Sequence, residues 1–200
     1  MVDRAFFDRP VVEVARDLVG WTVRHGATAG RIVETEAYHQ TEPACHAFAG
    51  PSPRLEALFA APGTAYVYRS YGVHALLNAV CEPAGVGAAV LIRALEPVSG
   101  AGLMARRRGR PRERELCSGP GKLTQALGVG LDRNGTSLLG DGPLLLEPPD
   151  GDGPGPVVAT GTRVGITRAV ELPWRFCDVT SPHVSRPWPP AMGGVSRMAR

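Results

Sequence analysis

Residues 64–81 restrict the possible folds of this 200-residue chain more than any other stretch. Both halves of the stretch are rich in aromatic, aliphatic and β-branched side chains, and Gly72 is the one break between them. Two strand-like runs joined by so short a break predict an antiparallel β-hairpin with Tyr71 and Gly72 at its tip. Residues 88–95 form a third strand-like run after a turn with proline and glycine, and we expect this strand to pair beside the hairpin.

The remaining pattern predicts short helices and strands in an order that does not alternate. The expected helices lie at residues 8–19, 54–61 and 119–127, and residues 100–115 are expected to be partly helical at most. The other expected strands are residues 21–24, 30–38, 144–146 and 162–170. Because the strands are not spaced as βαβ units, the pattern favours an α+β fold. The length fits one domain, residues 1–200, with an irregular proline-rich tail at 182–200.

The composition is that of an ordinary globular chain rather than a membrane, secreted or disordered one. Hydrophobic residues make up 44% of the chain, and no apolar run approaches the roughly 20 residues that span a bilayer. The first residues lack the basic and then apolar order of a signal peptide. The four cysteines lie far apart without a C-x-x-C pair, which argues for reduced thiols. We therefore expect a soluble intracellular protein without a membrane partner.

The positive charge of the chain is concentrated in one place. Residues 106–114 hold six arginines and one glutamate, a local charge of +5, although the whole chain carries only +3. Such a cluster suits an anionic partner such as a phosphate backbone, and a solvated loop is the alternative interpretation. Lys122 is the only lysine, so the chain offers little support for chemistry that needs a Schiff-base amine.

Two carboxylates stand on one predicted strand. If residues 30–38 are extended, Ile32, Glu34, Glu36 and Tyr38 share one face, and the two acids lie roughly 7 Å apart. Burying acids beside apolar side chains costs free energy unless the acids are paired or functional. A solvent-facing polar stripe is the plainer interpretation. A metal site is a further alternative, although the possible ligands match no strong motif: Glu34, Glu36, His39 and His46.

The four tyrosines gather around the same part of the chain. Tyr38 follows the acids on their strand, whereas Tyr66, Tyr68 and Tyr71 lie on the predicted hairpin. Clustered aromatic residues usually belong to a core. A tyrosine at a hairpin tip cannot be part of its own hairpin's core, and it has the shape of a wedge that could enter a stack of bases.

Several blocks of the sequence together resemble one family, the alkyladenine (3-methyladenine) DNA glycosylases of mammals and many bacteria. In family order the blocks are RIVETEAY at 31–38, PGTAYVYRSYG at 62–72, LIRALEP at 91–97, LCSGPGKL at 116–123 and RVGI at 163–166. The resemblance runs from about residue 15 to 176, and implies a bacterial member with one mixed domain, a curved antiparallel sheet and flanking helices. It implies a monomeric enzyme, active on damaged double-stranded DNA in the cytoplasm, that needs no cofactor or metal.

The resemblance also assigns roles to individual residues. Glu36 matches the general base that activates a water, and Arg93 with the main-chain carbonyl of Val164 matches the groups that hold this water. The residues implied to contact the flipped base are Tyr38, Ala44, His46, Tyr68 and Asn78. Tyr71 matches the side chain that intercalates into the duplex. The residues we expect on the DNA backbone are Arg106, Arg107, Arg108, Arg110 and Lys122.

The chemistry of base release is consistent with these roles. An alkylated purine can be cationic, so electron-rich rings favour it and one carboxylate suffices to activate water. A neutral base such as hypoxanthine needs protonation, and the sequence offers no assignable second acid, because Glu34 is interpreted as structural or pKa-tuning. Residues Arg69, Val73 and His74 depart from the family pattern, which bears on substrate preference. The alternatives are a non-catalytic binder of damaged DNA and a metal-dependent hydrolase.

Overall fold

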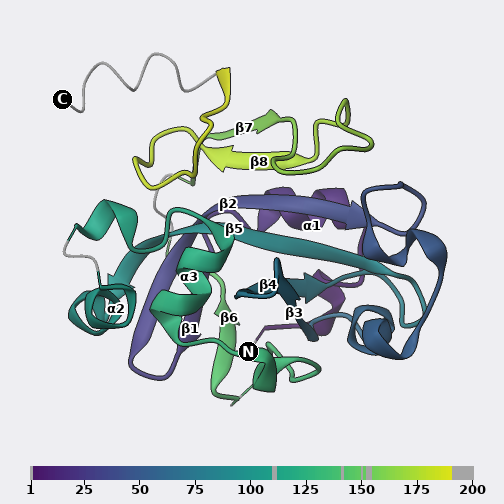
Figure 1. Cartoon of the computed structure of the whole chain (residues 1–200), viewed down its shortest axis with the longest axis horizontal. Coiled ribbons are helices and arrows are strands. Elements are labelled where there is room, and N and C mark those ends of the chain that lie inside the picture. The colour runs from purple at the N-terminus through teal and green to yellow at the C-terminus, as the bar shows by residue number, and fades with distance from the viewer. Residues whose placement is uncertain (1, 110–111, 141, 150, 152–154, 191–200) are drawn as a thin grey trace.

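An antiparallel β-sheet with long central strands organises the chain (Figure 1). The structure is a computed structural model that describes residues 2–109, 112–140, 142–149, 151 and 155–190. Its strands are β1 (Thr22–His25), β2 (Thr28–His39), β3 (Ala65–Ser70), β4 (His74–Val80), β5 (Ala88–Ser99), β6 (Leu144–Glu147), β7 (Val158–Gly161) and β8 (Arg175–Asp178). Its α-helices are α1 (Val11–Asp17), α2 (Ala101–Arg108) and α3 (Pro120–Leu127). Short 3-10 turns are η1 (Arg4–Phe6), η2 (His46–Ala49), η3 (Pro53–Phe59), η4 (Glu113–Glu115) and η5 (Leu131–Arg133).

The sheet is built around β2 and β5, which pair along most of their length. The strand order is β3-β4-β5-β2-β1-β6, and all pairings are antiparallel. The edge of β2 that faces away from β5 pairs with two strands: its beginning pairs with β1, and its residues 34–36 pair with β8. β7 and β8 thereby form a small layer beside β2 (Figure 1). The predicted α+β class with an antiparallel sheet is confirmed.

Alternate side chains of the strands face two different environments. Val67, Leu77 and Val90 pack into the large core together with side chains of α1 and α3. Tyr66 and Tyr68 belong to a smaller cluster on the other face of the sheet. The period of two that marked these strands in the sequence therefore separates a packing face from a face that can carry a site.

Most predicted elements are present. The hairpin is formed by β3 and β4 and turns at residues 71–73, and β5 pairs with β4 as expected. α1 follows Pro10, and α3 has Pro120 in its first turn. α3 ends at Gly128, whose φ of +73° belongs to the left-handed region that favours glycine at a helix C-terminus. β1, β2 and β6 match their predicted positions within a few residues.

Two local predictions need correction. The strand expected at residues 162–170 is wrong, because this stretch consists of bends and turns between β7 and β8. Gly165, with a φ of +79°, interrupts any extended run there. The short helix expected at 54–61 is the 3-10 turn η3. The arginine-rich segment 100–115 is partly helical, as expected: its first half forms α2, and Met104 of this helix is buried in the core.

Residues near the end of the described chain form no helix or strand between 182 and 189. All four cysteines are free and buried. Among the residues that the structure describes, no helix is long and apolar enough to cross a membrane.

Candidate active site

A bulge in β2 decides which way its two acids point. The register between β2 and β5 shifts between Ile32 and Glu34 and again between Glu34 and Thr35. An inserted residue of this kind re-aims the side chains that follow it. Ile32 packs into the large core, whereas Glu34 and Glu36 turn toward Arg93 of β5. The prediction that Ile32 shares a face with both acids is therefore wrong.

Strand pairing places Glu36 in a row that crosses four strands. Glu36 pairs with Leu91 of β5, Leu91 pairs with Asn78 of β4, and Asn78 pairs with Tyr66 of β3. Directly paired residues share a face of a sheet. This row brings a residue from position 36 beside residues from positions 66–91, which sequence spacing alone does not show.

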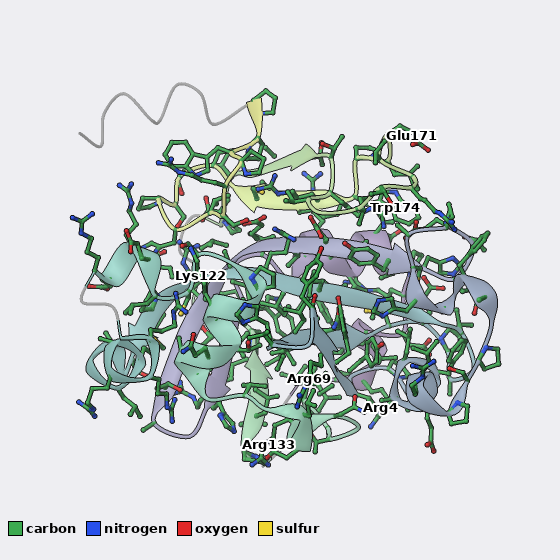
Figure 2. All side chains as sticks on the ribbon, viewed as in Figure 1. Arg4, Arg69, Lys122, Arg133, Glu171 and Trp174 are labelled. Carbon is green, nitrogen blue, oxygen red and sulfur yellow. The ribbon has the colours of Figure 1, made fainter. Side chains whose placement is uncertain are left out.

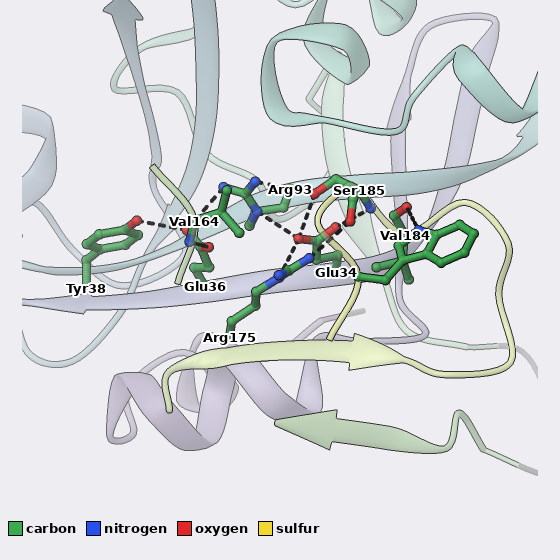
Figure 3. A network of polar contacts seen from close by, with 9 residues as sticks. Glu34, Glu36, Tyr38, Arg93, Val164, Arg175, Val184 and Ser185 are labelled. Atoms are coloured by element: carbon green, nitrogen blue, oxygen red, sulfur yellow. Dashed lines mark hydrogen bonds and ion pairs between the residues drawn. The ribbon is translucent and has the colours of Figure 1, made fainter. Parts of the chain in front are cut away.

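The Glu36 carboxylate is fully buried and accepts three hydrogen bonds (Figure 3). Oε1 accepts from the backbone N–H of Val164 at 2.7 Å. Oε2 accepts from the Tyr38 hydroxyl at 2.8 Å and from Nη1 of Arg93 at 3.2 Å. Burial raises the pKa of Glu36, while Arg93, the Val164 N–H and Tyr38 act to lower it. The resemblance pointed to the Val164 carbonyl, and the contact to Glu36 in the structure is made by the N–H of the same residue.

A second buried carboxylate, Glu34, holds the neighbouring arginines. Its Oε1 accepts from Nε of Arg93 and from Nε of Arg175, both at 2.8 Å. Ser185 donates to Glu34 twice, from its backbone N–H at 2.7 Å and its hydroxyl at 2.9 Å. Sequence reasoning identified Glu34 and Arg93 and missed Arg175 and Ser185, since no motif links positions 34, 175 and 185.

A pocket of about 690 Å³ opens in front of Glu36. Every residue that the resemblance implied for base contact, intercalation or support of the water lines it: Tyr38, Ala44, His46, Tyr68, Tyr71, Asn78, Arg93 and Val164. Glu36 lies directly behind three of these lining residues, which are its hydrogen-bond donors Tyr38, Arg93 and Val164. The pocket therefore brings together residues from positions 38–46, 68–93 and 164.

Aromatic rings form one wall of this pocket. Tyr66 and Tyr68 stack with their centroids 5.4 Å apart, and His46 meets Tyr68 edge-on at 4.6 Å. Nδ1 of His46 and the Tyr66 hydroxyl share a hydrogen bond of 3.0 Å. Burial lowers the pKa of His46, which favours the neutral ring at pH 7, and raises the pKa of Tyr68 to about 12. Asn78 is fixed by a bond from Nδ2 to the Tyr66 carbonyl at 3.0 Å.

Arg163 packs against Tyr38, another residue that lines the pocket, and sequence reasoning gave Arg163 no role. Its guanidinium lies 4.7 Å from the centroid of the Tyr38 ring and 5.3 Å from that of Trp174. Two of its nitrogens bind the Glu42 carboxylate at 2.6 and 3.0 Å. One face of Tyr38 is thus occupied by a buried, charge-paired arginine, which keeps the ring in place. The position of Arg163 next to Val164 in the RVGI block was the sequence feature that could have identified it as a residue of the site.

Tyr71 stands at the tip of the hairpin. Its side chain is 91% exposed, and its φ of +49° is uncommon for a residue with a bulky side chain. Val73, two residues on, is 75% exposed. The turn therefore presents a large apolar ring to solvent at the rim of the pocket.

The structure separates the arginines of the basic cluster. Arg108 and Lys122 line the pocket, and Figure 2 shows Lys122 at the start of α3. Arg106 is exposed, whereas Arg107 donates to the carbonyl of Ala126 at 3.0 Å, near the end of α3. Arg110 lies outside the described residues.

A second hollow of about 720 Å³ adjoins the first and shares Arg93, Arg108 and Lys122 with it. Its other charged lining residues are Arg112, Arg114, Arg186 and Glu115. One acidic side chain thus faces six basic ones, which gives this part of the surface a positive potential.

The possible metal ligands named from the sequence are dispersed among other partners. Nδ1 of His39 binds the Thr41 hydroxyl at 2.7 Å, and Nε2 of His39 lies 3.3 Å from Glu82. His46 is bonded to Tyr66, and Glu34 and Glu36 are bonded to arginines. Within the described part of the chain, no group of three or more His, Cys, Asp or Glu residues could hold a metal ion.

Comparisons with known proteins agree with this architecture. The profile of the family described as methylpurine-DNA glycosylase (MPG) matches residues 5–182. A protein of Rhodopseudomonas palustris (strain BisB18) is 53% identical over 185 residues, 92% of this chain and 90% of the relative. A protein of Bradyrhizobium diazoefficiens is 53% identical over 93% of this chain and 91% of its own length. A protein of Rubrobacter xylanophilus is 55% identical over 76% of this chain and 77% of its own.

All three relatives carry the provisional name 3-methyladenine DNA glycosylase. The class of protein is therefore that of the DNA-repair glycosylases. Within this class, the chain belongs to the methylpurine-DNA glycosylase family. The resemblance noted in the sequence is confirmed.

Proposed function

We propose that this protein flips alkylated or deaminated purines out of duplex DNA and hydrolyses their N-glycosidic bond, leaving an abasic site. The substrates belong to the class of 3-methyladenine, 7-methylguanine and hypoxanthine. The observation that carries the proposal is the buried Glu36 carboxylate, held by Arg93, Val164 and Tyr38 directly behind an aromatic pocket. The provisional names of the relatives support the same substrate class.

Glu36 is suited to act as a general base. All three of its contacts are hydrogen-bond donors, which stabilise the ionised carboxylate that a base requires. A carboxylate has about four acceptor positions, so one remains for an attacking water. As the glycosidic bond breaks, the sugar gains oxocarbenium character, and Glu36 takes the proton of the water that adds to it. The Val164 carbonyl is the group we expect to help hold that water.

The pocket favours a flipped cationic purine. Tyr38, His46 and Tyr68 offer rings for stacking, and a cation against such rings gains roughly 1–2 kcal/mol when desolvated. Neutral His46 adds no repelling charge. Asn78 donates to the Tyr66 carbonyl, and we expect it to crowd the exocyclic amine of a normal guanine. The residue that protonates a neutral leaving base is not among these side chains.

The DNA backbone is expected to contact the basic side of the pocket. Arg108 and Lys122 line the pocket, so they are the strongest of the backbone residues proposed from the sequence. Arg106 is exposed and available, whereas Arg107 is engaged with α3. Tyr71 is proposed to fill the space that the flipped nucleotide leaves in the duplex. The enzyme is proposed to act as a monomer in the cytoplasm, where bacterial DNA lies.

The first prediction tests Glu36. In a duplex with one 7-methylguanine or one hypoxanthine, Glu36→Gln should lower single-turnover base release by at least about 100-fold, since general-base catalysis contributes about that factor or more. Base release is measured directly by chromatography. Glu13→Gln, which removes an exposed acid on α1, is the matched control. Release by Glu36→Gln at the wild-type rate would contradict the mechanism.

The same assay separates the alternatives. A non-catalytic binder would bind the lesion selectively and release no base even at high protein concentration. A metal-dependent hydrolase would lose activity in a chelator. Strand cleavage without heat or alkali, abolished by Lys122→Gln, would contradict a purely hydrolytic glycosylase.

A further inference from the structure

All three nitrogens of the Arg93 guanidinium are engaged, each by a different residue. Nε donates to Glu34 at 2.8 Å, Nη1 donates to Glu36 at 3.2 Å, and Nη2 donates to the Ser185 hydroxyl at 3.3 Å (Figure 3). A planar guanidinium bound along three directions has its rotation fixed. The position of Nη1 relative to Glu36 therefore depends on Glu34 and Ser185.

Glu34 and Ser185 form a support for Arg93 that lies outside the pocket proposed to hold the base. Neither residue lines that pocket. Glu34 is fully buried, and Arg175 helps to offset its charge by donating to Oε1, the same oxygen that accepts from Arg93. The hydroxyl of Ser185 links both partners, because it donates to Glu34 at 2.9 Å and accepts from Arg93.

Ser185 comes from a part of the chain that the family profile does not reach. The match ends at residue 182, and residues 182–189 form no helix or strand. This segment is held instead by side chains. Val184 packs with Val33 and Cys177 in a small core, and the Trp188 indole N–H donates to the Val184 carbonyl at 3.1 Å. These contacts fix the segment, so Ser185 is presented to Glu34 in one position.

We infer that Ser185 is a positioning residue for catalysis, which acts with Glu34 to hold Arg93 against Glu36. The inference rests on the proposed role of Glu36 as general base. Arg93 supplies the positive charge nearest to the Glu36 carboxylate, and an arginine that turns away stabilises the ionised form less. Ser185 lines the second, basic hollow, but it neither lines the base pocket nor contacts Glu36, so its effect on Glu36 passes through Arg93 and Glu34.

The groups around Glu36 determine how this effect depends on pH. On its own strand Glu36 faces Glu34 and Tyr38, on β5 it faces Arg93, and the loop after β7 gives the Val164 N–H. Tyr68 of β3 also interacts electrostatically with Glu36. Two further arginines contact the neighbours of Glu36: Arg163 packs against Tyr38, and Arg175 of β8 donates to Glu34. Among these groups, loss of the Ser185 hydroxyl releases Arg93, the main cation that lowers the pKa of Glu36. The acidic limb of the rate profile should then move to higher pH.

The experiment compares Ser185→Ala with Ser185→Thr and Ser181→Ala. Threonine keeps a hydroxyl and should restore much of the activity. Ser181 is a buried serine of the same segment whose hydroxyl accepts from the His183 N–H and does not contact the network, so it controls for cavity effects. Single-turnover release of 7-methylguanine is measured from pH 4.5 to 8 and normalised to the protein that binds a non-hydrolysable lesion analogue.

We expect Ser185→Ala to lower the rate at neutral pH about tenfold, the order expected for removing one hydrogen bond to a charged group. The acidic limb should shift upward, with unchanged affinity for the lesion analogue. Normalisation to binding-competent protein removes any effect of unfolded material. Equal rates and superimposable pH profiles for Ser185→Ala and Ser181→Ala would overturn the inference. An active Glu36→Gln variant would instead contradict the general-base role of Glu36, and absence of base release by the wild type would contradict the proposed function, so these failures are distinguishable from failure of the inference.

Discussion

At the scale of single residues, the site depends on the groups that surround one buried acid. Glu36 has no exposed surface, yet three donors surround it and a pocket lies beyond them. Desolvation and hydrogen bonding act in opposite directions on the pKa of such a group. The balance here leaves the pKa of Glu36 above its ordinary value of 4.5.

This balance predicts the pH dependence of base release. Glu36 is active when ionised, so the rate should fall as the pH falls through its raised pKa. With 7-methylguanine, whose charge is permanent near neutrality, the acidic limb reports the enzyme rather than the lesion. We expect this limb above the range of an ordinary glutamate, measured as single-turnover rates at fixed ionic strength. A rate that stays constant down to pH 4.5 would contradict this expectation.

At the scale of elements, the hairpin and the loop after β7 are held in place by different interactions. The hairpin is a local structure with paired strands on both sides of Tyr71, and this pairing sets its tip at the rim of the pocket. The loop lacks strand pairing, and side chains hold it instead, through Arg163 on Glu42 and the Val164 N–H on Glu36. A strand was predicted there because residues 162–170 are rich in β-branched side chains, whereas the side-chain contacts that hold the loop leave no pattern in the sequence.

The hairpin yields a prediction for Tyr71→Ala. Base release from a duplex should fall about tenfold, because extruding a nucleotide costs a few kcal/mol and the wedge offsets part of that cost. Release from the same lesion in a single strand should be almost unchanged. The melting temperature should stay within a few degrees, since the side chain is exposed.

Val73→Ala is the matched control for this change, because it truncates an exposed apolar side chain of the same turn. An equal decrease of activity on duplex and single-stranded substrates would show that Tyr71 acts in chemistry rather than in flipping. Identical rates for Tyr71→Ala and the wild type on the duplex would remove the wedge from the mechanism.

At the scale of the whole molecule, positive charge gathers on the side where the two hollows meet. Arg108 and Lys122 belong to both hollows, and Arg112 extends the patch with a side chain that is 81% exposed. Phosphate contacts release counterions, so the logarithm of the binding constant should fall linearly with the logarithm of salt concentration.

We expect the double variant with Lys122→Gln and Arg112→Gln to weaken binding to undamaged and damaged duplexes alike. The salt slope should become shallower by about one unit for each phosphate that the variant no longer neutralises. Arg16→Gln, an exposed arginine on α1, should leave both quantities unchanged. Affinity is measured by fluorescence anisotropy between 50 and 300 mM salt. An unchanged slope in the double variant would place the backbone on another surface.

The sequence by itself determined the elements whose signals are local. Alternating apolar residues specified β2–β5, proline and glycine marked the ends of α3, and ordered blocks revealed the family and the residues of the base pocket. Three features were decided only by the tertiary structure: the bulge that separates Ile32 from the acids, the turns where a strand was expected at 162–170, and the binding of Arg175 and Ser185 to Glu34, which holds Arg93. The physical reason is the same for all three. Each depends on a buried polar group finding partners far away in the chain, and such pairing leaves no periodic trace in the sequence.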